Sequence, residues 1–271
     1  MGTETFHTPG PVRLAVAVSA GRVDVQAVPG ATETTVEFEV VKGDKSLESD
    51  ARIELRQRGD DSEVIVTAPR AGRIFGREEF NVSIVTPEGA HADVSTASAD
   101  VQARGTFSQF ELETASGDVA VEHVTGRLKA RSASGDLTFK TVGGEASVNT
   151  ASGDVFVARL GGEGTFRTAS GDVIVREADN GLSVNTASGD QKIASVAAGE
   201  VRLRAASGDV EVGIRRGSRV HVDARSGSGD LQSELELGDE EPSGDGPLVE
   251  LNAVTASGDL RIVRAGEQPR T

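Results

Sequence analysis

A three-residue pattern, Ser-Gly-Asp, recurs along the chain and supplies the residue types most able to do chemistry. The stretch from residue 149 to residue 173 reads NTASGDVFVARLGGEGTFRTASGDV and contains the word TASGDV twice. Carboxylates at regular spacing could bind Ca²⁺, which takes six or more oxygen ligands. The candidate ligands are the aspartates of successive patterns: Asp118, Asp136, Asp154, Asp172 and Asp190.

Counted from Asp100, which belongs to the related word Ser-Ala-Asp, the spacing of these aspartates is 18 residues at every step to Asp190. The steps then lengthen to 19, 21 and 29 residues at the last three aspartates, Asp209, Asp230 and Asp259. The final interval contains an acidic insertion with Pro and Gly, residues 238–247, which predicts a surface loop. A repeat of this length is typical of a solenoid, in which each unit stacks on its neighbours.

Each repeat contains two short segments in which apolar residues alternate with variable ones. After Asp154, for example, Val155 and Val157 flank Phe156. Period-two alternation indicates β-strands with one buried face, and the Gly-containing words between them indicate turns. Two short strands cannot bury their inner faces alone, whereas stacked parallel coils can. We therefore predict an all-β fold, a flattened parallel β-solenoid with 18-residue coils and two strands per coil.

The chain is expected to divide into a cap, a regular solenoid and a tail. Residues 1–95 are strand-rich but irregular and predict N-terminal coils or a cap continuous with the solenoid. Residues 96–265 hold the regular repeats, and residues 266–271 form the tail. A cap is expected because an open solenoid end exposes unpaired backbone and core. The insertion and the tail are expected to cover the other end.

Two segments of the cap carry more specific predictions. The word SAGRVDV resembles a coil in which Arg22 takes the place of the aspartate. Residues 51–69, ARIELRQRGDDSEVIVTAP, predict a hairpin that turns at residues 59–62.

Composition limits the classes of function. The net charge of −15 opposes nucleic-acid binding, which needs a cationic surface. The absence of Cys excludes disulfides and thiolate chemistry. Nine Phe without Trp or Tyr argue against a sugar cleft built on aromatic platforms. No signal-peptide pattern or membrane-length apolar run occurs, so we expect a cytoplasmic location and no membrane insertion.

Two segments carry a resemblance to a known family. They are FHTPGPVRLAVAVSAGRVDVQA, residues 6–27, and DVEVGIRRGSRVHVDARSGSGDLQSEL, residues 209–235, and many SGDV units lie between them. The chain resembles the bacterial β-strand-repeat family of unknown function called Toastrack or "putative adhesin", from Phe6 to about Ala265. The resemblance implies a solenoid without established catalysis, with some members associated with envelope-stress or membrane-associated systems. It implies no catalytic residue.

The repeated aspartates have a structural and a chemical interpretation. Gly can supply the positive φ of a turn while Ser and Asp hydrogen-bond its backbone, which favours turn capping. The alternative is a calcium-binding β-roll, although only one of the two turns per coil carries Asp. A glycan-active or glycan-binding β-helix is a second alternative, but a catalytic groove needs a non-repeating carboxylate cluster. The scattered His7, His91, His123 and His221 show no metal spacing.

Outward positions of the strands are better candidates for partner binding than the repeated aspartates. Phe156 and Ile174 occupy equivalent positions on adjacent coils and predict a small apolar patch. A basic stripe is predicted on the opposite face, from Lys129, Arg131, Arg167, Arg202 and Arg204. The threonines of the repeats, by contrast, share the parity of the apolar residues and are expected to point inward.

The sequence as a whole favours a non-enzymatic structural or protein-interaction scaffold. Every repeated residue has a folding role, and the varied residues lie on the solvent faces. We expect an unknown protein partner and no cofactor, no nucleic acid and no metal. Self-association through the solenoid ends is a further possibility that the repeat allows.

Overall fold

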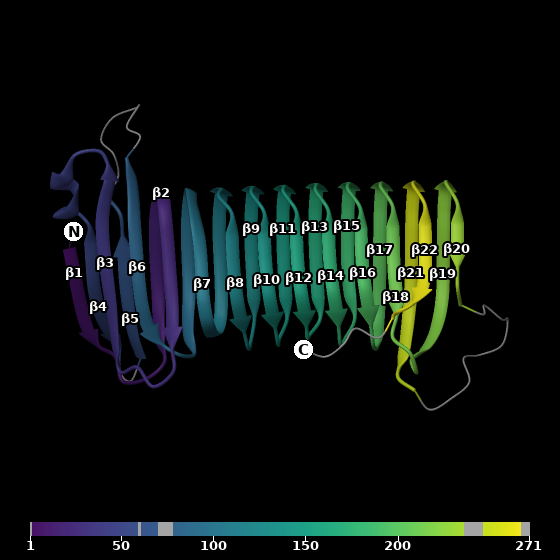
Figure 1. The fold of residues 1–271 in the computed structure, drawn as a ribbon, viewed down its shortest axis with the longest axis horizontal. Coiled ribbons are helices and arrows are strands. Elements are labelled where there is room, and N and C mark those ends of the chain that lie inside the picture. Colours follow the sequence, from purple (N-terminus) through teal and green to yellow (C-terminus); the bar gives the residue numbers. More distant parts are fainter. Residues whose placement is uncertain (1, 59–60, 70–77, 236–245, 267–271) are drawn as a thin grey trace. The chain divides into compact units, whose positions relative to one another are not determined.

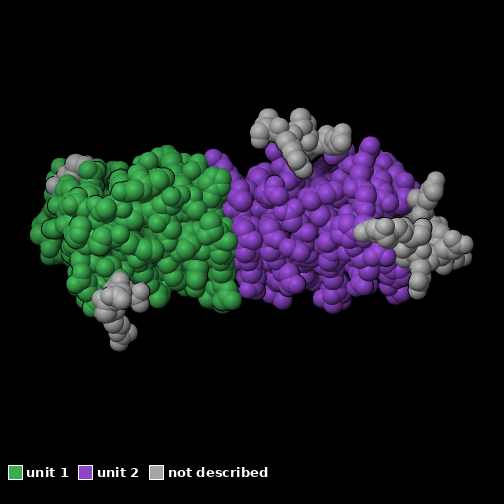
Figure 2. All heavy atoms as spheres, turned by 90° about the horizontal axis from the view of Figure 1, so that it is seen from below, with its two compact units in different colours: residues 1–138 green, residues 139–271 purple. Residues whose placement is uncertain are grey.

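The structure is a computed structural model that describes residues 2–58, 61–69, 78–235 and 246–266. It is all-β apart from one short 3₁₀ turn, Lys45–Glu48, and it divides into two compact units, residues 1–138 and 139–271 (Figure 2). No helix of the described chain has the length and hydropathy to span a membrane. Each unit is built from stacked parallel coils, so the predicted β-solenoid class is confirmed (Figure 1).

Unit 1 is organised around two long strands that continue through corners of the coil. β2 (Val12–Val28) pairs in parallel with β7 (Ala90–Ser116). β7 in turn pairs in parallel with β8 (Val119–Val124) and with β9 (Leu128–Ser134). In both units we call the strands that lead into a Ser-Gly-Asp corner the front sheet, and those that follow it the back sheet.

The N-terminal strands extend the two sheets of unit 1 with mixed pairing. On the back sheet, β1 (Gly2–His7), β3 (Glu33–Lys42) and β6 (Glu79–Pro87) form antiparallel pairs, and β6 then joins β2 in parallel. On the front sheet, β4 (Arg52–Arg58) and β5 (Asp61–Thr67) form an antiparallel hairpin, and β5 joins β2.

Both specific predictions for this region can be located in the strand register. The hairpin within residues 51–69 is confirmed by the β4–β5 pairing, although positions 59 and 60 of its turn lie outside the described residues. Arg22 lies directly opposite Asp100 in the β2–β7 ladder, so the SAGRVDV coil has the predicted register.

Unit 2 repeats a front strand and a back strand in each coil. Its strands follow β10 (Leu137–Val142), which spans the division between the units: β11 (Ala146–Ser152), β12 (Val155–Leu160), β13 (Gly164–Ser170), β14 (Val173–Ala178), β15 (Leu182–Ser188), β16 (Gln191–Val196), β17 (Gly199–Ser207), β18 (Val210–Ile214), β19 (Arg219–Ser228), β20 (Leu231–Ser233), β21 (Leu248–Ser257) and β22 (Leu260–Arg264). Odd-numbered strands form the front sheet and even-numbered strands from β12 the back sheet, all in parallel pairs.

The predicted alternation decides which side chains form the core. Val155 and Val157 are buried, while Phe156 between them is half-buried on the outside. Phe166 is fully buried, and its ring occupies the space over Gly164, where a Cβ would lie 2.6 Å from Phe166 Cε2. Gln191 takes an apolar position between Val173 and Val210. Its Nε2 donates to Thr186 Oγ1 at 2.9 Å and to the Arg204 carbonyl at 2.8 Å.

The last two coils of unit 2 stack in an order that differs from their order in the chain. β21 pairs with β17 on one side and with β19 on the other, and β22 likewise lies between β18 and β20. Residues 248–264 therefore form a coil that lies between residues 199–214 and residues 219–233 (Figure 1). The insertion and tail expected to cover this end lie mostly outside the described residues.

The apolar content of the two coils explains this intercalation. Inward residues of the inserted coil, such as Val249, Leu251 and Ile262, are at most 2% exposed. In the outer coil Val222 and Ser233 hold the positions that Leu251 and Ile262 hold in the inserted coil, so the inward set of the outer coil is smaller and more polar. Since apolar burial stabilises in proportion to area, the coil with the stronger apolar set gains more from the position buried on both sides.

Cysteine pairs can test the stacking order, because the native chain contains no Cys. Arg202 lies directly opposite Asn252, which in turn lies opposite Asp223. Opposite residues of neighbouring strands are about 4.8 Å apart, which a disulfide can span. We expect Arg202→Cys/Asn252→Cys to form a disulfide under mild oxidation and Arg202→Cys/Asp223→Cys to remain reduced. The reverse result, read by mass spectrometry, would mean stacking in chain order.

Candidate functional site

The aspartates of the Ser-Gly-Asp corners bind the backbone of the neighbouring coil. Asp154 Oδ1 accepts a hydrogen bond from the Asp172 amide at 2.8 Å, and Asp172 Oδ1 accepts one from the Asp190 amide at 2.8 Å. The same contact, at 2.8 to 3.0 Å, repeats along Asp100–Asp118–Asp136 in unit 1 and along Asp190–Asp209–Asp259–Asp230 in unit 2. We call this series the aspartate ladder.

The glycine of each corner leaves no room for a side chain. Gly171 has φ of 131°, and a Cβ placed there would lie 2.3 Å from the carbonyl oxygen of Gly153. Gly189 repeats this arrangement over Gly171, at 2.2 Å. Only glycine combines this left-handed backbone with such a close approach between coils, so the corner pattern serves the stacking of the coils.

The threonines before the corners point inward, as their parity predicts. Thr150, Thr168 and Thr186 are 6 to 8% exposed. Thr150 Oγ1 donates to the Ser152 carbonyl at 2.8 Å, and Thr186 Oγ1 donates to the Gly189 carbonyl at 3.3 Å. These two hydroxyls therefore stabilise their corners from inside, whereas the buried Thr168 Oγ1 has no hydrogen-bond partner among the described residues.

These contacts favour turn capping as the role of the repeated acids. Along the aspartate ladder one carboxylate oxygen is already bound to an amide in the next coil. Within the described ranges, no three His, Cys, Asp or Glu side chains are grouped so that they could hold one metal ion. Calcium binding stays a prediction that rests on the spacing of the acids alone.

Phe156 and Ile174 lie side by side on the back sheet of unit 2, as their spacing predicts. They are directly opposite across β12 and β14, and both are half-buried. The guanidinium of Arg176 lies 5.4 Å from the centroid of the Phe156 ring, within the range of a cation–π contact. On the other side Lys192 follows Ile174 in the same row. The apolar patch is therefore small and bordered by basic side chains.

The predicted basic stripe is divided between the units. Lys129 and Arg131 are on β9 in unit 1, where Lys129 Nζ lies 3.2 Å from Glu111 Oε2 and Arg131 lies opposite Glu113. The acids at 111 and 113 thus face the basic side chains of β9.

In unit 2 the basic side chains fall into two rows of the front sheet. Arg202 forms an ion pair with Glu200 on its own strand. Arg167 and Arg204 lie in the next row, two coils apart, with Asn185 between them. The structure therefore brings Arg167 and Arg204 into one row and separates them from Arg202.

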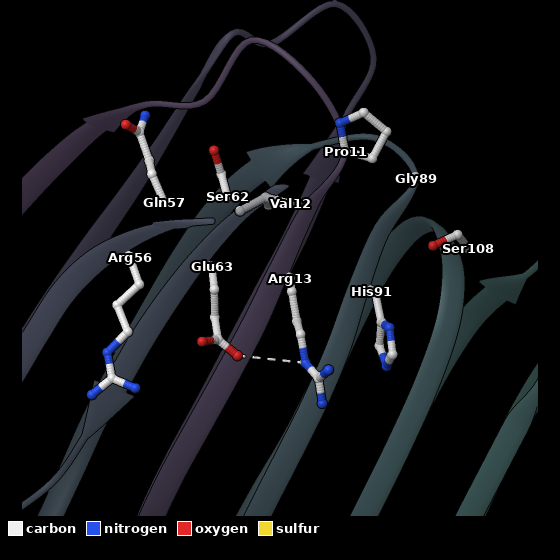
Figure 3. Close-up of a pocket in the computed structure, with 10 residues that line it drawn as sticks. All are labelled: Pro11, Val12, Arg13, Arg56, Gln57, Ser62, Glu63, Gly89, His91 and Ser108. Carbon is white, nitrogen blue, oxygen red and sulfur yellow. Dashed lines mark ion pairs between the residues drawn. The ribbon is translucent and has the colours of Figure 1, made fainter. Parts of the chain in front are cut away.

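A polar hollow on the front sheet of unit 1 was not anticipated from the sequence (Figure 3). Its volume is about 800 Å³, within the usual range of ligand sites. Glu63, Arg13 and His91 line it from β5, β2 and β7, directly opposite one another. Arg13 Nε lies 3.6 Å from Glu63 Oε1, and Arg13 Nη2 lies 3.4 Å from Asp93 Oδ2. Both separations exceed those of tight ion pairs.

His91 is the titratable group of this hollow with the most unusual environment. Its Nε2 is buried and has no hydrogen-bond partner among the described residues. Burial lowers the pKa of His91 below its ordinary value of 6.5, the Arg13 charge lowers it further, and Glu111 and Asp93 oppose the shift. The only sequence signal was the alternation AHADV, which places His91 and Asp93 outward.

Comparisons with known proteins identify the family. The model of the Toastrack DUF4097 family matches residues 12–166 and 144–262. The chain therefore belongs to the Toastrack family, as the resemblance predicted. No curated protein matches the chain.

The solved structures that this chain matches are distant in sequence and superpose with low TM-scores. A "putative adhesin" from Parabacteroides merdae is 14% identical with a TM-score of 0.40, over 97% of this chain and 96% of that one. One from Bacteroides fragilis is 12% identical with a TM-score of 0.38, over 97% and 95%. A "putative cell adhesion protein" from Clostridium sporogenes is 12% identical with a TM-score of 0.27, over 97% and 99%. These similarities are too distant to indicate what this chain binds.

The aspartate ladder predicts unequal effects of two equivalent substitutions. Asp172→Ala removes the acceptor of the Asp190 amide, and we expect it to lower the free energy of unfolding by about 1 kcal/mol. Asp230 is the matched control, because it ends the ladder and no amide of a described residue donates to its carboxylate. Asp230→Ala should change stability by only a few tenths of a kcal/mol. Chemical denaturation measures both, and equal losses would contradict the role of the ladder.

The environment of His91 predicts a pH dependence of stability. Because folding lowers its pKa, the unfolded chain binds the proton more readily. The folded chain should lose stability as the pH falls below about 6.5 towards the lower folded-state pKa. We expect His91→Gln to remove part of this loss, so that the difference in free energy of unfolding between variant and wild type shifts in favour of the variant at low pH. A difference that is the same at about pH 7.5 and about pH 5 would contradict this assignment.

Proposed function

We propose that this chain is a non-enzymatic scaffold that binds a protein partner through outward side chains of its coils. One observation carries the proposal: the carboxylates that repeat from coil to coil are bound to the backbone of the fold. The ladder carboxylates accept backbone amides, and the hydroxyls of Thr150 and Thr186 donate to corner carbonyls. Chemistry directed at a ligand is therefore left to the side chains that differ between coils.

The outward position two residues after each ladder aspartate shows how side chains differ between coils. On successive coils of the back sheet it holds Phe156, Ile174, Lys192 and Glu211, in direct register. The backbone geometry is the same while the chemistry changes from apolar to basic to acidic. A rigid surface of this kind suits recognition of one partner, because specificity resides in varied residues on an ordered framework.

The proposal includes a cytoplasmic location and a link to envelope-stress or membrane-associated systems, with no cofactor. The net charge of −15 supports a partner other than nucleic acid. Self-association through the ends is not included. The edge strand β19 carries His221, Asp223 and Arg225, and charged edges oppose pairing with another strand.

Affinity capture from the native host tests the proposal. We expect the wild-type chain to retain a specific protein and Phe156→Glu/Ile174→Glu to lose it, because the added charges would occupy the apolar patch. Gln102→Glu/Ala120→Glu is the matched control, since these two residues hold the equivalent outward positions in unit 1. Melting temperatures would show that both variants fold.

Two outcomes would overturn the proposal. One is that no host protein is retained by the wild-type chain above the level of an unrelated acidic protein. The other is turnover: release of reducing ends from a panel of polysaccharides would make the chain a glycan-active enzyme. Equal binding by the two double variants would reject the Phe156–Ile174 patch.

A further inference from the structure

One outward row on the front sheet of unit 2 carries an arginine at every second coil. In stacked order its residues are Arg167, Asn185, Arg204, Val254 and Arg225, and we call them the arginine row. Neighbouring strands lie about 4.8 Å apart, so successive arginines are about 9.6 Å apart along the stack. The intercalated coil produces this spacing, because it places Val254 between Arg204 and Arg225.

The arginine row is a local basic surface on an acidic chain. Arg167 and Arg204 are exposed and form no ion pair with a described residue. Arg225 lies 3.3 Å from Asp223, and its side chain is 75% exposed. The row itself contains no acid, so its guanidinium groups have hydrogen-bond donors available to an anionic partner.

A hollow of about 580 Å³ lies over part of this row. Arg204 and Arg225 flank it, and Val254, 36% exposed, lies between them. Ala206 and Ala256 also line it and are exposed. Their methyl groups form a shallow apolar floor that lets another backbone approach closely, while the arginines provide charge beside it.

The spacing of the charges restricts the kind of partner that fits. In an α-helix, residues seven apart share one face and are about 10.5 Å apart. Over two repeats the helix spacing exceeds the arginine spacing by about 2 Å. The long, flexible arginine side chains can bridge this difference. An extended strand repeats on one face every 6.8 Å or so, which does not match. Every third phosphate of a nucleic-acid strand would fall about 10.2 Å apart, but the net charge of −15 opposes such a partner. The helix has the matching period.

We propose that the arginine row binds an amphipathic helix of a protein partner. Acidic residues at every seventh position of the helix pair with Arg167, Arg204 and Arg225. Small apolar residues beside them lie on Val254 and the alanine floor, as in other helix-in-groove complexes. This inference rests on the proposed scaffold function and adds a second binding surface, on the front sheet, to the Phe156–Ile174 patch of the back sheet.

Two synthetic peptides of identical composition provide the test. The first is an Ala-rich helix of about three heptads with Glu at every seventh position, and the second has its Glu residues distributed around the helix. We expect the heptad peptide to bind at least about tenfold more tightly, because exposed ion pairs are individually weak and only the first peptide forms three at once. The difference should shrink as salt is added. Fluorescence anisotropy measures both affinities.

Matched variants assign the binding to the row. We expect Arg167→Gln/Arg204→Gln/Arg225→Gln to lower the affinity for the heptad peptide to the affinity for the control peptide. Arg202→Gln is the control variant. Arg202 is exposed on the same sheet, but it lies in the neighbouring row and pairs with Glu200 of its own strand. Arg202→Gln should leave the preference for the heptad peptide over the control peptide unchanged. Circular dichroism would show that the variants fold.

Several results would overturn this inference. Equal affinity for the two peptides would mean that net charge alone attracts them, and an equal loss in Arg202→Gln would mean that the row is not the site. Binding of hyaluronan in preference to the heptad peptide would indicate a polysaccharide surface. If neither peptide binds while affinity capture still retains a host protein, the helix inference fails and the scaffold proposal stands.

Discussion

The stacking of coils in this protein depends on a contact made where each coil turns its corner. An aspartate carboxylate accepts the backbone amide of the neighbouring coil, and a left-handed glycine beside it stacks on the glycine below. Both features require the same residue types at the same position in the regular coils from Asp118 on; the Asp100 coil has Ala99 in place of glycine, and the β2 coil has Arg22 in place of aspartate. The 18-residue period is therefore the length of chain needed to return to this contact, and the repeated acids are explained by it.

The topology at the C-terminal end shows how burial overrides chain order. The inserted coil has Leu251 and Ile262 where the outer coil has Val222 and Ser233. The chain therefore places its stronger apolar coil inside and leaves the charged strand β19 at the edge. The inserted coil also places Val254 between Arg204 and Arg225, so the two arginines lie two coils apart in one row, whereas chain order would make them direct neighbours. A packing preference thus produces the surface that we propose to bind a helix.

Much of the fold could be predicted from the sequence, because strand period and corner pattern are local signals. The inward Val155 and Phe166, the inward threonines and the register of Arg22 against Asp100 followed from alternation and spacing. The order of the last coils could not, since it depends on the relative burial of two segments that each fit the pattern. The hollow at Arg13 and His91 was also hidden, because β2 and β7 bring together residues far apart in the sequence. The burial of Gln191 was hidden as well, because this position of the pattern otherwise holds an apolar residue.

The central claim is that the aspartate ladder serves the stacking of coils and that binding is left to the varied outward residues. A calcium titration followed by calorimetry and thermal unfolding tests it most directly, with magnesium as the control. The account predicts no saturable heat of binding and the same melting temperature in calcium, magnesium and chelator. Stoichiometric calcium binding, or a rise in melting temperature with millimolar calcium and none with magnesium, would contradict it.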